Sequence, residues 1–176
     1  IGSGFNATFV NDGQGRVRSD NSVKYVSPSF SGLTASLYYA GKQTKAPTTA
    51  FSTTFGAYDM QGTTELGLNY ANGPLAASFS TLKQDYKEVG PVIGALAYTQ
   101  TVNTLGANYA FGAVNLFGLY QNNKRSDNAL NDKTFSISGT YTMGAVVLMA
   151  QAGQLEDVTD KKAKMFALGA DYNLSK

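Results

Sequence analysis

Apolar and polar residues alternate along most of the chain after residue 15. Arg16, Arg18, Asp20, Ser22 and Lys24 share one parity, and the apolar residues of segment 16–26 share mainly the other. Segment 27–32 contains a proline and a glycine, and alternation then resumes from residue 33 to residue 39. Because successive side chains of a strand point to opposite faces, this pattern predicts a β-hairpin with one apolar and one polar face.

A tyrosine-containing motif recurs at 66–73, 105–112, 137–144 and 168–174. The residue just before the tyrosine is polar in every copy, and the tyrosine itself lies on the apolar face. A short turn and another alternating run follow each of the first three copies, so each unit is predicted to be a hairpin. The whole chain then has about nine antiparallel strands between residues 16 and 176.

The connections at the other end of these hairpins are predicted to be long and polar. They cover residues 41–63, 82–96, 122–132 and 155–162, and residues 1–15 are predicted to be loop because they are rich in Gly and Asn. Asn103 falls on the apolar face of its strand, which a β-bulge or a later strand start would explain.

Alternation by itself fits two architectures. A soluble β-sandwich would bury the apolar face against protein, whereas a membrane barrel would expose it to lipid and line a lumen with the polar face. Short turns at one end, long loops at the other and strands of roughly 9 to 11 residues favour an antiparallel transmembrane β-barrel.

Five tyrosines share one register beside the short turns or at the end of the last run. Strand propensity alone explains any single tyrosine, but five at one level predict an aromatic girdle at a membrane interface. These residues are Tyr25, Tyr70, Tyr109, Tyr141 and Tyr172.

Composition excludes several classes of function. The chain has no Cys, His or Trp, so disulfides, thiol chemistry and histidine-based catalysis are excluded, and its carboxylates form no paired motif. The net charge of +2 is too small to indicate nucleic-acid binding. No apolar run approaches the roughly 20 residues of a spanning helix. We therefore expect no enzyme activity, no cofactor and no metal.

Two features of the sequence are shared with a known family. One is segment 20–33, and the other is the repeated Leu-Gly-x-Asn-Tyr hairpin motif, whose last copy lies in segment 167–176. They resemble the general diffusion porins of Gram-negative bacteria, in particular the anion-selective type of beta-proteobacteria, over nearly the whole chain. The resemblance implies a homotrimer of 16-stranded barrels in the outer membrane, each pore being narrowed by an inward-folded loop.

Nine strands would leave two unpaired sheet edges in a bilayer, where unpaired backbone groups are very costly. The terminal aromatic residue with which such barrels usually finish is also absent. The chain is therefore interpreted as an internal fragment, a partial barrel in which residues 1–15 are the remnant of the constriction loop. Its implied partners are outer-membrane lipid, lipopolysaccharide and solutes in transit.

The candidate site is electrostatic. The resemblance implies that basic residues of the first strand lie at the constriction, and this role is carried to Arg16 and Arg18. Lys24 is ranked third because it lies closer to the periplasmic end, and Asp20 partly offsets the positive charge of these residues. The alternative is that these charges lie near the outer end of the strand, solvated and without consequence. Parity predicts further pore-lining positions at Glu65, Asn69, Asn108, Thr140 and Asp171.

Lys133, Lys162 and Lys164 lie near the loop end and share parity with lipid-facing residues. They are expected either to meet lipid phosphates or to form a solvated rim.

The leading hypothesis for function is passive diffusion of small hydrophilic solutes, with a preference for anions. One alternative is a soluble secreted β-sandwich acting as an adhesin or binding module, which would stay monodisperse without detergent. A second alternative is a substrate-specific outer-membrane channel, which would show saturable flux.

Overall fold

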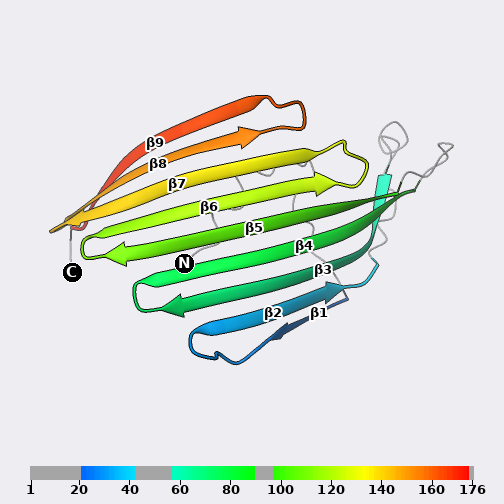
Figure 1. Cartoon of the computed structure of the whole chain (residues 1–176), viewed down its shortest axis with the longest axis horizontal. Coiled ribbons are helices and arrows are strands. Elements are labelled where there is room, and N and C mark those ends of the chain that lie inside the picture. The colour runs from blue at the N-terminus through cyan, green and yellow to red at the C-terminus, as the bar shows by residue number, and fades with distance from the viewer. Residues whose placement is uncertain (1–20, 43–56, 90–96, 175–176) are drawn as a thin grey trace.

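The computed structural model of the chain describes residues 21–42, 57–89 and 97–174, with only the backbone described for 57–60, 88 and 89. These residues form one antiparallel sheet whose nine strands are paired in sequence order (Figure 1). The strands are β1 (Ser22–Val26), β2 (Leu33–Ala40), β3 (Ala57–Asn72), β4 (Leu75–Val89), β5 (Ala97–Phe111), β6 (Val114–Arg125), β7 (Asn131–Met143), β8 (Val146–Glu156) and β9 (Lys162–Tyr172). The predicted all-β antiparallel architecture is confirmed.

The strands are longer than the alternating pattern indicates. Strand β3 has 16 residues and β4 and β5 have 15 each, so residues 57–63 and 82–89 are strand and not loop. The connections 126–130 and 157–161 have only five residues each. The prediction of long loops was therefore wrong there, because polar side chains mark contact with water while the backbone ladder continues between neighbouring strands.

The register is regular apart from one irregularity in β3, between Met60 and Gly62. Strand β5 pairs without interruption, and Asn103 lies opposite Thr81 on β4 and Asn122 on β6. The bulge or later strand start expected near Asn103 was therefore wrong. Asn103 belongs to a row of polar residues that borders the apolar face.

The short turns require glycine. Strands β3–β4, β5–β6 and β7–β8 are joined by two residues each, and Gly73, Gly112 and Gly144 at the first turn position have φ of +56°, +62° and +61°. Positive φ is readily reached only by glycine, and hairpins with such turns match the twist of the strands. These connections form the tight end of the sheet.

The two faces of the sheet differ in chemistry and in exposure. One face, called the apolar face, carries exposed side chains on all nine strands, including Leu37, Leu66, Phe79, Leu105, Leu116, Tyr120, Phe135, Ile137, Leu148, Phe166 and Leu168. Phe135 is 54% exposed, whereas Thr134 and Gln100 on the opposite, polar face are each 4% exposed. Burial is thus inverted relative to a soluble protein.

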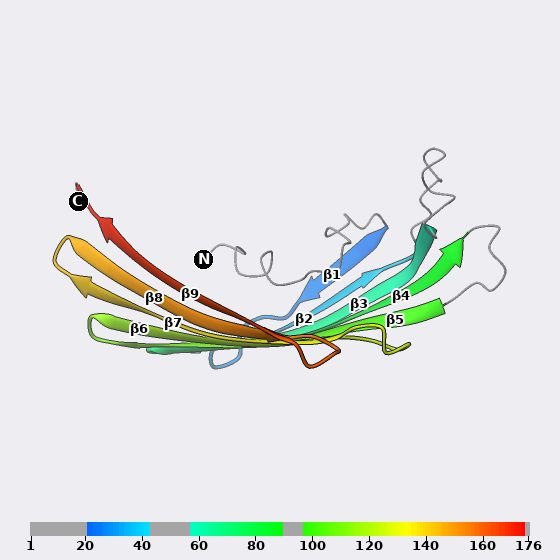
Figure 2. The same cartoon turned by 90° about the horizontal axis from the view of Figure 1, so that it is seen from above.

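The sheet is strongly curved (Figure 2). Side chains converge on the concave side of a curved sheet, so the less exposed polar face lies inside the curve and the apolar face lies outside. No second layer of the described residues covers the apolar face, and only Ala40 and Tyr98 are buried hydrophobic residues in this part of the chain. The described residues also contain no helix long and apolar enough to cross a membrane.

Candidate pore wall and rim

The structure places the predicted pore-lining residues on the polar face. Lys24 lies opposite Tyr38, and Tyr38 lies opposite Glu65, so the three form one row across β1, β2 and β3. Thr140 lies opposite Met149, and Asp171 lies opposite Val147. Three of the four predicted constriction residues, Arg16, Arg18 and Asp20, lie outside the described residues.

Two of the predicted lining residues come together. Asn69 on β3 and Asn108 on β5 both line a shallow depression of about 480 Å³, which Ser78 and Phe117 also line. The depression combines amide and hydroxyl groups with an aromatic ring. It can be wetted, and it offers no set of groups that would hold a metal ion or cofactor.

Towards the loop end, the polar face is held together by side-chain amides. The Gln100 Nε2 donates to Asn123 Oδ1 at 2.8 Å, and the Gln121 Nε2 donates to Thr104 Oγ1 at 3.1 Å. Both bonds join β5 to β6, and a buried amide without such a partner would be costly. Gln100, Gln121 and Asn123 were not predicted from the sequence. The alternate spacing of Gln121 and Asn123 was a usable signal, but segment 122–132, which contains Asn123, was interpreted as loop.

A cation also lies on the polar face at the loop end. The Tyr86 and Tyr98 rings stack with centroids 5.0 Å apart, and the Arg125 guanidinium carbon lies 3.6 Å from the Tyr98 centroid. Arg125 Nη2 pairs with Asp127 Oδ2 at 2.6 Å. The guanidinium is therefore fixed by a cation–π contact, and the neighbouring carboxylate balances its charge.

The polar face is not uniformly polar. Phe117 and Leu119 on β6 and Met149 and Met165 on β8 and β9 share its parity. A Cβ added at Gly169 would lie 3.4 Å from Met149 Cε, so this methionine lies over a glycine of the next strand. Glycine leaves room for these side chains to lie along the wall instead of projecting from it.

Charge is distributed unevenly between the two faces. Among the described side chains of the strands, the polar face carries the cations Lys24 and Arg125 and the carboxylates Glu65, Asp132 and Asp171. This part of the wall has no excess of positive charge. The described wall therefore gives no support by itself for a preference for anions.

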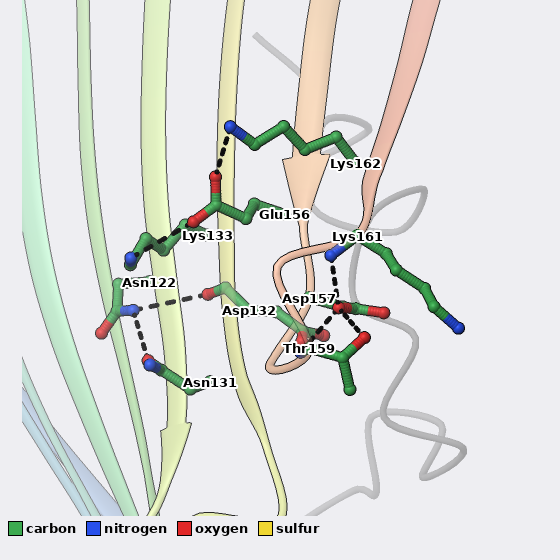
Figure 3. A network of polar contacts seen from close by, with 9 residues as sticks. All are labelled: Asn122, Asn131, Asp132, Lys133, Glu156, Asp157, Thr159, Lys161 and Lys162. Carbon is green, nitrogen blue, oxygen red and sulfur yellow. Dashed lines mark hydrogen bonds and ion pairs between the residues drawn. The ribbon is translucent and has the colours of Figure 1, made fainter.

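The loop end of the apolar face is rich in lysine. Its described strand side chains include six lysines and two carboxylates, namely Lys83, Lys87, Lys124, Lys133, Lys162 and Lys164 with Asp85 and Glu156. Glu156 pairs with two of these lysines, as Lys133 Nζ lies 3.5 Å from its Oε1 and Lys162 Nζ lies 3.2 Å from its Oε2 (Figure 3). This strip, the lysine rim, borders the apolar face.

The predicted aromatic girdle lies at the tight end of the apolar face. Tyr25, Tyr109, Tyr141 and Tyr172 are exposed and Tyr70 is partly exposed. The Tyr109 and Phe111 rings lie 5.8 Å apart. Rings with a polar hydroxyl at the edge of an apolar band suit a membrane interface, and their position there stays a prediction.

The loop between β8 and β9 is organised by Asp157. Its Oδ1 accepts hydrogen bonds from the Thr159 hydroxyl and amide, each at 2.7 Å, and from the Lys161 amide at 3.0 Å (Figure 3). The hydrogen bond from the Thr159 side chain is the largest cause that holds the pKa of Asp157 below its ordinary value. The ionised carboxylate is therefore the form that orders this loop.

We expect this loop to loosen in acid. Because the folded pKa of Asp157 is lowered, its contribution is present above the ordinary value of about 3.9 and is lost as the pH falls through the lower folded pKa. Amide exchange at Thr159 and Lys161, corrected for intrinsic rates, should lose protection below about pH 4. The Asp157→Asn variant should lack this pH dependence, and an equal dependence in the variant would contradict the assignment.

Comparison with known proteins agrees with this geometry. The profile of the Gram-negative porin family matches residues 1–176. Outer membrane porin protein 32 of Delftia acidovorans is 32% identical over 171 residues, a match that covers 91% of this chain and 44% of that protein. The chain thus spans less than half the length of this relative.

Two solved structures share the fold. An anion-selective porin from Comamonas acidovorans matches with a TM-score of 0.70 and 28% sequence identity, over 90% of this chain and 46% of that one. A loop L8 deletion mutant of OmpT, an outer membrane protein of Vibrio cholerae, matches with a TM-score of 0.58 over 89% of this chain and 53% of that one. At 19% identity, the second match supports the fold alone.

These matches decide between the two architectures that alternation left open. The nine-stranded sheet corresponds to part of a porin barrel, so the soluble β-sandwich alternative was wrong. The exposed apolar face is the lipid-facing side of such a barrel, and the polar face is its inner wall. The chain therefore belongs to the Gram-negative porin family, whose members are outer-membrane channel proteins and not enzymes.

Proposed function

We propose that the protein containing this chain forms a water-filled channel through which small hydrophilic solutes diffuse passively across the outer membrane. The inverted burial of the sheet carries this proposal. Buried Gln, Asn, Thr and Ser side chains line the concave face, while Leu, Phe and Ile side chains are exposed on the convex face. A membrane barrel needs this distribution because lipid surrounds it and water fills it.

The channel requires a closed barrel. Among the described residues, β1 pairs only with β2 and β9 pairs only with β8. An open edge in hydrocarbon leaves a row of backbone groups without partners, and further strands would remove both edges. We propose a 16-stranded barrel of which these nine strands form part, assembled as a homotrimer and surrounded by outer-membrane lipid and lipopolysaccharide.

We further propose that the channel favours anions. The matched structure from Comamonas acidovorans is described as an anion-selective porin, which supports the preference by analogy. The described wall carries two cations, Lys24 and Arg125, and three carboxylates, so we propose that most of the preference comes from the constriction. We assign it to Arg16 and Arg18, with a smaller role for Lys24 and a partial offset by Asp20. Arginine suits a narrow section because it is permanently charged and weakly hydrated.

Planar-bilayer recording of the full-length protein tests both proposals. We expect stepwise openings and, under a KCl gradient, a reversal potential that indicates chloride preference. Neutralising both arginines in an R16Q/R18Q variant should lower the chloride-to-potassium permeability ratio at least roughly fivefold, because each unit charge about 4 Å away contributes roughly 1 kcal/mol in water. An outward-facing control, Lys124→Gln, should leave the ratio unchanged.

The outcomes separate the hypotheses. An absence of openings would refute the channel, whereas cation preference, or a ratio unaffected by R16Q/R18Q, would refute only the assignment of anion preference. Saturable flux with block by one solute would instead support the substrate-specific channel.

A further inference from the structure

Three lysines of the lysine rim lie together on the last three strands. Lys133 on β7 lies opposite Glu156 on β8, and Glu156 lies opposite Lys162 on β9. Lys164, two residues further along β9, lies opposite Gln154. We call Lys133, Lys162 and Lys164 the lysine cluster.

The cluster carries positive charge that its own ion pairs do not cancel. Glu156 is the one carboxylate that pairs with it among the described side chains, so three ammonium groups share one negative charge. The side chains of Lys133 and Lys162 stay 48% and 51% exposed, whereas that of Glu156 is 23% exposed. Figure 3 shows the carboxylate between the two lysines. The ammonium groups thus remain open to a second anion.

Exposed phenylalanine side chains lie next to the lysine cluster and indicate which kind of anion would bind there. Phe166 follows Lys164 on the same face of β9 and is 69% exposed, and Phe135 has the same relation to Lys133 on β7. A ligand that fills this site must therefore be anionic where it meets the lysines and apolar where it meets the phenylalanines. A free anion has no apolar part, whereas a lipid has both. Long lysine side chains can also reach the headgroup level from an apolar surface.

We propose that the lysine cluster binds the phosphate group of a membrane lipid whose acyl chains lie against Phe135, Phe166 and Leu168. The phosphate competes with Glu156 for the ammonium groups of Lys133 and Lys162, and Lys164 adds a third donor. The site lies on the outside of the barrel. It depends on the apolar face meeting lipid, and it is independent of which solutes the channel prefers.

Titration of the delipidated full-length protein in non-ionic detergent tests the site, with phosphatidic acid as the probe. Diacylglycerol, which is the same lipid without its phosphate, and inorganic phosphate are the comparison ligands. The wild type should bind phosphatidic acid more tightly than either, and added salt should weaken the binding. A K133Q/K162Q/K164Q variant should bind it roughly a hundredfold more weakly, at about fivefold for each lysine.

The loop offers a matched control. Lys161 adjoins Lys162 in sequence, but its side chain points away from Lys133, Glu156 and Lys162 (Figure 3). Lys161→Gln should change the affinity less than twofold. The bilayer conductance of every variant should match that of the wild type, since the cluster faces away from the lumen. A normal conductance also shows that the variant has folded.

A second variant keeps the proposal testable if the triple variant does not fold. Glu156→Gln removes the carboxylate that competes with phosphate, so it should tighten the binding of phosphatidic acid several-fold, whereas a purely structural ion pair predicts no such gain. Unchanged affinity in the triple variant, weaker binding in E156Q, or equal affinity for phosphatidic acid and diacylglycerol would overturn the proposal. Inorganic phosphate that binds as tightly as the lipid would overturn the lipid assignment.

Discussion

Replacing Ile137 with Arg is expected to destabilise the membrane-folded protein by about 2–4 kcal/mol, the cost of a lipid-facing cation near the middle of a bilayer. Ile137 is exposed in the middle of β7 on the apolar face, opposite Gly118 and Ala152. None of these neighbours offers an anion or a hydrogen-bond acceptor on its side chain. Urea unfolding of the protein in lipid vesicles measures the change.

The adjacent residue supplies the control. Ser138 lies on the polar face, opposite Phe117 and Gln151, so an arginine there would enter the water-filled side of the sheet. Ser138→Arg should change stability by less than about 0.5 kcal/mol, as for most solvent-facing substitutions. It should also raise the chloride-to-potassium permeability ratio. Equal stability costs at positions 137 and 138 would show that the assignment of the two faces is wrong.

Replacing Gly32 with Ala should cost about 3 kcal/mol or more, since two unfavourable effects coincide. Gly32 has φ of +87°, a conformation that costs a residue with a Cβ about 1–2 kcal/mol. An added Cβ would also overlap the backbone carbonyl oxygen of Ala71, which a side-chain rotation cannot relieve. The Gly32 carbonyl accepts a hydrogen bond from the Ala71 amide at 2.9 Å, so the two segments cannot separate freely.

Gly73 provides the matched comparison for this substitution. It also has positive φ, at +56°, but a Cβ added there would meet nothing within 4 Å. Gly73→Ala should therefore show only the conformational cost of about 1–2 kcal/mol. Unfolding midpoints of the two variants should differ clearly, and similar midpoints would mean that the approach of Gly32 to Ala71 does not constrain the fold.

Some features of this structure can be predicted from the sequence and others cannot. Side-chain parity is local, because the backbone of a strand sends alternate residues to opposite faces whatever the partner strand is. Parity therefore predicts one shared face for Glu65, Asn69, Thr140 and Asp171, and the strand register puts them together on the polar face, while their role as pore lining stays a prediction. Strand length is less local, since pairing continues through polar residues wherever an adjacent strand supplies hydrogen bonds. That is why residues 57–63 and 82–89 were misassigned as loop.

Contacts between strands required the register. Lys133, Lys162 and Lys164 were assigned to the outer face from parity, but nothing local to them indicates that Glu156 lies between two of them. The stack of Tyr86, Tyr98 and Arg125 likewise joins three strands at positions that become neighbours only once β4, β5 and β6 are aligned.

By itself, the amino-acid sequence determined the strand type, the apolar and polar faces and the places where glycine turns the chain. These depend on period-two geometry and on the φ angles that single residues allow. Only the tertiary structure decided the length of each strand, the direction of curvature and which charges meet. Those features arise from hydrogen bonds and side-chain contacts between residues that are distant along the chain.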